Sequence, residues 1–134
     1  MLQKNFIDHM MDHQSIRKFT DQTVSQEIIN TCIKAGQAAA SSSFVQVTSV
    51  IQVNSKKSRT ALAIAAGGQS YVESAAVFLV FCADLQRNQQ ICLHLQHQMP
   101  TGFTEQTLIA SVDTALFAQN VLLAAQSLGL GGVF

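Results

Sequence analysis

Residues 105–128 read EQTLIASVDTALFAQNVLLAAQSL, and this stretch decides the fold. It is apolar around most of its circumference and rich in alanine, which is typical of a helix buried within a protein or at a subunit interface. Its polar residues favour a buried helix of a soluble protein over a membrane span, because polar groups are costly in lipid; they are Asp113, Gln119, Asn120 and Gln126. We therefore expect a long buried central helix that ends at Gly129.

Two strands are predicted before this helix. Residues 45–53 alternate valine with polar residues, the period of a strand, and residues 76–83 form a continuous apolar run typical of a central strand. A further strand is expected at 130–134, where the chain stops. An apolar end of this kind indicates a truncated domain, with a C-terminal edge strand as the alternative. Helices are expected over 1–12, 26–39 with Ser25 as N-cap, 59–66, 71–76 and 88–98.

Composition limits the possible partners. With 48% hydrophobic and 12% charged residues, the chain has more apolar surface than a small monomer usually covers, so we expect a homodimer. A net charge of zero gives no broad electrostatic reason to bind nucleic acid or an anionic membrane. The three cysteines are irregularly spaced and no signal peptide is apparent, so a cytoplasmic location is expected. Residues 1–134 are expected to be a single domain.

The segment His13-Gln14-Ser15-Ile16-Arg17 has the strongest chemical character. In an extended conformation His13, Ser15 and Arg17 point to the same side, where a ring nitrogen, a hydroxyl and a guanidinium fork can converge on a phosphate. The alternative is an exposed basic strand whose Arg17 pairs with a surface carboxylate.

Two polar loops are further candidates. Ser41-Ser42-Ser43 offers hydroxyls and free backbone amides to a phosphate or a ring edge, although a plain polar turn has the same composition. Gly67-Gly68-Gln69-Ser70 combines close backbone approach with a side-chain amide, and the alternative is a helix C-cap with a solvated Gln69.

Other patterns carry less chemistry. The glycine-rich run 129–132 follows a helix, the reverse of a dinucleotide-binding fingerprint. His94 and His97 lie near Cys92 without a Cys-x-x-Cys pair, so no metal ligands are assigned, although a small zinc enzyme stays open as an alternative. Lys56, Lys57 and Arg59 are interpreted as a solvated charge run. No catalytic acid, base or nucleophile is assigned.

Taken together, five motifs resemble the nitroreductase superfamily, and within it the group of oxygen-insensitive NADPH nitroreductases (type A) and NADPH-flavin oxidoreductases. The resemblance covers nearly the whole chain, with the motifs in the same order and spacing. They are HQSIRKFTD from residue 13, SSSFVQ from 41, GGQ from 67, FCAD from 81 and GLGGV from 129.

This resemblance implies an α+β fold with a mostly antiparallel sheet flanked by helices, working as a homodimer with FMN at the subunit interface. NADPH would reduce the flavin, and a nitroaromatic, a quinone or free flavin would take the electrons in a ping-pong cycle. Residues carried over to the flavin site are His13, Gln14, Ser15, Ile16, Arg17, Ser41 and Gln69, with Phe134 where the group often has an aromatic residue.

Members of this group continue beyond the matching segment, so we expect the chain to be an N-terminal fragment that binds FMN weakly or not at all. The residues that would recognise NADPH lie in that further part. A non-catalytic dimeric interaction domain, or an inactive fragment, is the alternative, and bound flavin would distinguish these possibilities.

Overall fold

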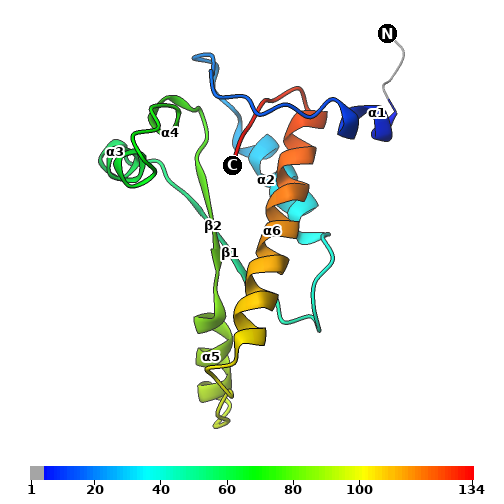
Figure 1. Cartoon of the computed structure of the whole chain (residues 1–134), viewed down its shortest axis with the longest axis vertical. Coiled ribbons are helices and arrows are strands. Elements are labelled where there is room, and N and C mark those ends of the chain that lie inside the picture. Colours follow the sequence, from blue (N-terminus) through cyan, green and yellow to red (C-terminus); the bar gives the residue numbers. More distant parts are fainter. Residues whose placement is uncertain (1–4) are drawn as a thin grey trace.

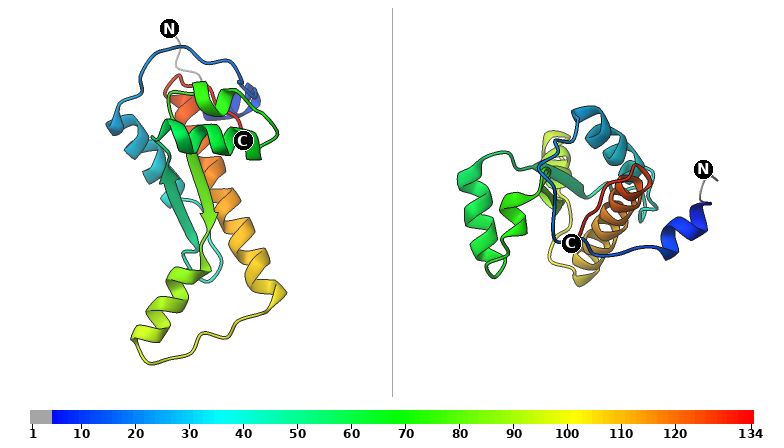
Figure 2. Two further views of the ribbon diagram at one scale, coloured as in Figure 1. Left: turned by 90° about the vertical axis from the view of Figure 1, so that its left-hand side faces the viewer. Right: turned by 90° about the horizontal axis from the view of Figure 1, so that it is seen from above.

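The computed structural model describes residues 5–134 and shows an elongated α+β molecule (Figure 1). A two-stranded antiparallel sheet and the long helix α6, Thr104–Ser127, lie side by side along the long axis. The remaining helices lie around this pair, as the two further views in Figure 2 show. Of the helix predicted over 1–12, Phe6–Met11 forms α1, and residues 1–4 lie outside the described part of the chain.

Helix α6 matches the predicted bounds to within one residue, but only one side of it is buried. The buried side carries Ala110, Asp113, Thr114, Ala118, Val121 and Leu122. Leu108, Val112 and Leu116, which follow one another at helical spacing, are 60%, 54% and 42% exposed. By length and hydropathy α6 would also suit a membrane span, yet it contacts α2 and both strands as a core helix does.

Helix α2, Gln26–Gln37, packs along α6 (Figure 1). It begins where predicted, because the Ser25 hydroxyl accepts the Ile28 amide at 3.3 Å and caps the first turn. Gly36 lies against α6, and a Cβ at this position would stand 2.5 Å from a ring carbon of Phe117. The close approach of the two helices therefore requires glycine there.

The sheet pairs β1, Thr48–Gln52, with β2, Leu79–Ala83, in antiparallel register from Thr48 opposite Ala83 to Gln52 opposite Leu79. Both strands were predicted, but β1 begins later than the alternating pattern suggested. Residues Ser43, Phe44 and Gln46 have φ values of 50°, 53° and 56°, which extended backbone cannot accommodate. The loop after α2 therefore extends to the start of β1.

Helix α3, Lys56–Ala65, and the short α4, Tyr71–Ser74, pack together at one end of the sheet (Figure 2). α3 starts earlier than predicted, because the Ser55 hydroxyl accepts the Ser58 amide and makes Ser55 an N-cap.

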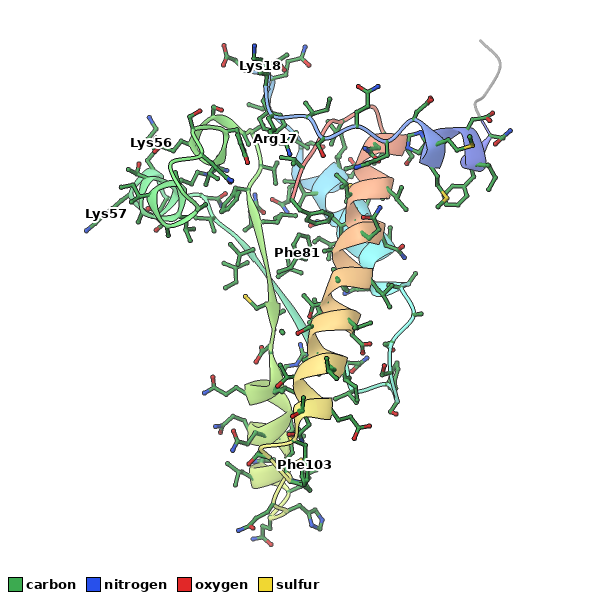
Figure 3. All side chains as sticks on the ribbon, viewed as in Figure 1. Arg17, Lys18, Lys56, Lys57, Phe81 and Phe103 are labelled. Carbon is green, nitrogen blue, oxygen red and sulfur yellow. The ribbon has the colours of Figure 1, made fainter. Side chains whose placement is uncertain are left out.

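The interpretation of residues 56–59 as a solvated run is wrong for Arg59, which is only 9% exposed. Its guanidinium donates to backbone carbonyl oxygens of Val53, Glu73, Ala75 and Ala76. Lys56 and Lys57 are exposed, as predicted, and extend away from the molecule (Figure 3). Arg59 thus joins the end of β1, α4 and the segment that leads into β2.

Helix α5, Leu85–His94, follows β2 directly, three residues before the predicted start. Asp84 is its N-cap: Oδ1 accepts the Arg87 amide at 3.2 Å, while Oδ2 accepts the Ser49 hydroxyl at 2.5 Å. The Ser49 and Arg87 hydrogen bonds lower the pKa of Asp84 below its ordinary value of 3.8.

This lowered pKa predicts a pH dependence of stability. Because the folded protein holds the ionised carboxylate, the contribution of Asp84 is present above pH 3.8 and is lost as the pH falls through the lower folded pKa. In the wild type, the free energy of unfolding measured with urea should be lower near pH 3 than at pH 7. Asp84→Asn keeps a capping oxygen without the titration, so a variant with the same pH-dependent decrease would contradict the assignment.

Candidate functional site

The two ends of the described chain meet beside the last turns of α6. Ser15 forms an isolated parallel bridge with Gly132, and the Ile16 amide donates to the Gly132 carbonyl oxygen at 3.0 Å. Ile16 packs over Gly131, where a Cβ would come within 2.8 Å of Ile16 Cγ1. The two segments predicted to be extended are therefore neighbours, joined by one bridge in place of a regular ladder.

Side chains alternate along this segment. Ile16 and Lys18 line an open cavity, whereas the exposed Ser15 and Arg17 do not line it; the alternation ends at Lys18, because Phe19 lines the cavity too. Such alternation is expected of extended backbone, in which neighbouring side chains point to opposite sides. Figure 3 labels Arg17 and Lys18 at this end of the molecule. Within residues 5–134 the Arg17 guanidinium has no carboxylate partner, so the surface ion pair considered above is not formed there.

His13 is held by α6. Its Nδ1 lies 2.9 Å from Nε2 of Gln126, and His13 itself is exposed. When the Gln126 amide nitrogen donates, Nδ1 is the acceptor and the ring proton sits on Nε2, from which it can donate to an anion. Gln126 was not among the predicted site residues, because its position beside His13 depends on the tertiary fold.

The cavity has a volume of about 1290 Å³ and lies between α6, α2 and β2. Its lining is predominantly apolar, and among residues 5–134 Lys18 is the only charged side chain in it. Phe134, 69% exposed, lines it together with Ile16. This cavity therefore offers apolar contacts and little to hold a phosphate.

The serine loop, residues 41–46, lies elsewhere on the molecule. The amide of Ser42 donates to both carboxylate oxygens of Asp113, at 3.1 and 2.9 Å, so it is not free as the sequence suggested. Asp113 and Gln126 are roughly 20 Å apart along α6, at about 1.5 Å of rise per residue. Ser41, which is exposed, is thus separated from His13 within one chain.

Gln69 follows the C-cap of α3. Gly67 and Gly68 have φ values of 83° and 81°, and the amides of Gly68 and Gln69 donate back to the Ala63 carbonyl oxygen. The C-cap alternative therefore describes this turn correctly. Gln69 is exposed, which leaves its side-chain amide accessible from solvent.

Backbone groups at the predicted site are only partly available. The Ile16 amide donates to Gly132 and is therefore not available to a ligand, which leaves the Ile16 carbonyl oxygen for such a contact. Gln14 is exposed. Across residues 5–134 no three His, Cys, Asp or Glu side chains gather in a metal-binding arrangement, so His94, His97 and Cys92 have no further ligand candidates there.

Comparison with known proteins identifies the family of this chain. The profile described as Nitroreductase family matches residues 10–134. The chain belongs to the nitroreductase family. Over 130 residues this nitroreductase-family chain is 51% identical to the NADPH-flavin oxidoreductase of Vibrio harveyi, covering 97% of this chain and 52% of that protein. It is 45% identical over 128 residues to the oxygen-insensitive NADPH nitroreductase of Salmonella typhimurium, and the match covers 96% of this chain and 52% of that protein.

Solved structures agree with this assignment. The NADPH:FMN oxidoreductase from Vibrio harveyi, determined with NAD+, matches with a TM-score of 0.91 at 50% identity, over 97% of this chain and 55% of that one. A nitroreductase from Bacillus subtilis matches with a TM-score of 0.92 at 43% identity, over 95% of this chain and 52% of that one. The nitroreductase-family chain thus has the N-terminal part of that fold, and it spans about half the length of the curated relatives it matches.

Proposed function

We propose that this chain is the N-terminal part of a single-domain, FMN-dependent oxidoreductase that takes electrons from NADPH and delivers them to a nitroaromatic, a quinone or free flavin. The two reactants would use the site in turn, by a ping-pong mechanism. The observation that carries the proposal is the pairing of Ser15 with Gly132, which supports the segment that bears His13, Ser15 and Arg17.

The residues in this segment fit the phosphate of FMN. The Arg17 guanidinium is exposed and without a carboxylate partner in the described chain, and its planar fork suits two phosphate oxygens. The Ser15 hydroxyl lies on the same side, and His13 can donate through Nε2 while Gln126 holds Nδ1. Gln14 and the Ile16 carbonyl oxygen would add backbone contacts.

The serine loop would complete the site from a second copy of the chain. Ser41 is separated from His13 along α6 by more than the length of a flavin ring system, so the serine loop of one chain lies remote from the phosphate segment of the same chain. A homodimer removes this difficulty, and the exposed face of α6 at Leu108, Val112 and Leu116 supplies apolar surface for it. Gln69 would hydrogen bond to the polar ring edge or the ribityl chain, and Phe134 would pack nearby.

Bound FMN would supply the hydride and electron transfer, which no side chain here can perform. The chain's part is to hold and orient: Arg17 would neutralise the phosphate and Ser15 and His13 would donate hydrogen bonds to it, while Ser41 and Gln69 would fix the ring. No side chain is assigned to proton transfer.

The test is the visible absorption spectrum of the purified, desalted protein, before and after incubation with FMN, together with its mass. One retained FMN per chain, bleached by NADPH under anaerobic conditions and restored by a quinone, is the expected result for the full-length protein of which this chain is the N-terminal part. A colourless protein that stays dimeric with FMN in excess would overturn the proposal and favour a non-catalytic interaction domain.

A further inference from the structure

The serine loop has a backbone conformation that its own sequence does not favour. Ser43, Phe44 and Gln46 all have left-handed φ values near 50°, although none of them is glycine. L-residues adopt this region at a cost, and such residues persist only where surrounding contacts hold them. The loop must therefore be fixed from outside.

Contacts from two helices hold this loop. From α5, the Asn88 amide donates to the Val45 carbonyl oxygen at 2.7 Å, and the Arg87 guanidinium donates to that of Gln46. From α6, the Asp113 carboxylate accepts the Ser42 amide with both oxygens. The first two contacts hold the end that leads into β1, so the end next to Ser41 depends on Asp113.

Asp113 is an unusual residue at its position. It is 5% exposed, within the most apolar helix of the chain, where an unpartnered carboxylate would be strongly unfavourable. Both of its described hydrogen bonds go to one backbone amide of the loop. The buried Asp113 carboxylate therefore has its described hydrogen-bond partner in the serine loop.

We propose that Asp113 is a positioning residue for the flavin site: by holding the Ser42 amide it fixes the left-handed loop and keeps the exposed Ser41 hydroxyl directed outward to the cofactor. This inference rests on the function proposed above. It also assigns the part of the cofactor concerned, because a buried carboxylate behind the loop repels a phosphate. The loop should therefore contact the neutral ring or ribityl chain.

The test compares Asp113→Ala and Asp113→Asn with a control, Thr114→Val. Thr114 is the next residue on α6, is buried, and its hydroxyl lies 3.2 Å from that of Thr48, so its replacement removes a hydrogen bond that does not touch the loop. Two quantities are measured: the exchange rate of the Ser42 amide proton by NMR, and FMN affinity from quenching of flavin fluorescence.

In Asp113→Ala, the Ser42 amide should exchange about tenfold faster or more, and FMN should bind about tenfold more weakly or worse. Asp113→Asn keeps one acceptor oxygen and should recover most of both losses. Thr114→Val should leave both quantities within about twofold of wild type.

An unchanged Ser42 exchange rate in Asp113→Ala would overturn the proposal, and so would faster exchange with unchanged FMN affinity. If Asp113→Ala does not fold, Asp113→Asn is used in its place. Faster exchange of the Ser42 amide in Asp113→Asn, together with the FMN affinity of the wild type, would also overturn the proposal. All variants are made in the full-length protein, because this N-terminal part is expected to bind FMN weakly or not at all. Failure of the underlying function is recognised separately, because the unsubstituted full-length protein would then bind no FMN.

Discussion

Replacing Arg17 with alanine in the full-length protein is expected to prevent FMN retention through desalting, with a loss of affinity on the order of 100-fold. The lost contact is a charge-assisted pair of hydrogen bonds to phosphate, which contributes about 3 kcal/mol. Arg17→Lys keeps the charge without the planar fork, so an intermediate loss of about tenfold is expected. Flavin fluorescence titration at fixed ionic strength measures all three proteins.

Lys18→Ala is the matched control for this prediction. Lys18 has the same formal charge and is the next residue in the chain, but unlike Arg17 it is among the residues that line the apolar cavity. Its replacement should change FMN affinity by less than about threefold, a value typical of a distant surface charge. Equal losses in Arg17→Ala and Lys18→Ala would mean that net charge alone matters and that the segment does not recognise phosphate.

Replacing Arg59 with methionine is expected to lower the free energy of unfolding by about 3–5 kcal/mol. Methionine fills the space of the side-chain stem but cannot donate, so carbonyl oxygens of Val53, Glu73, Ala75 and Ala76 lose their guanidinium partner. Because these groups join β1, α4 and the entry to β2, the loss affects the whole sheet end. Chemical denaturation monitored by circular dichroism measures the change.

Lys57→Met provides the comparison for Arg59. It removes a charge from the same helix at an exposed position, where substitutions usually change stability by less than about 0.5 kcal/mol. If the two methionine variants unfolded at the same denaturant concentration, the buried guanidinium would not stabilise the fold as described.

Local patterns in the sequence predicted most of the secondary structure. The long helix at 105–128, the apolar strand at 76–83 and the Ser25 cap depend on periodicity and on neighbours within one turn, and each was found to within a few residues. The start of β1 was predicted too early, because Ser43, Phe44 and Gln46 are left-handed in a loop that hydrogen bonds to side chains from α5 and α6. No property of those residues alone indicates it.

The candidate site shows the same division. Motifs predicted the residues proposed to bear its chemistry, and the pairing of Ser15 with Gly132 places two of those motifs side by side. What could not be predicted is which group each residue contacts. Arg59 looked like its lysine neighbours in sequence, and Asp113 like an isolated polar residue in an apolar helix, because their partners come from distant segments.

The bridge between Ser15 and Gly132 also has a consequence for biosynthesis. Ser15 and Ile16 leave the ribosome well before Gly132, which is their backbone partner. Until then the Ile16 amide must stay solvated, and closing so long a loop is entropically costly and slow. The helices and the β1–β2 pair can form earlier, so the segment that bears Arg17 is ordered late, and a nascent chain would acquire the phosphate affinity proposed above only after the remainder of this region has folded.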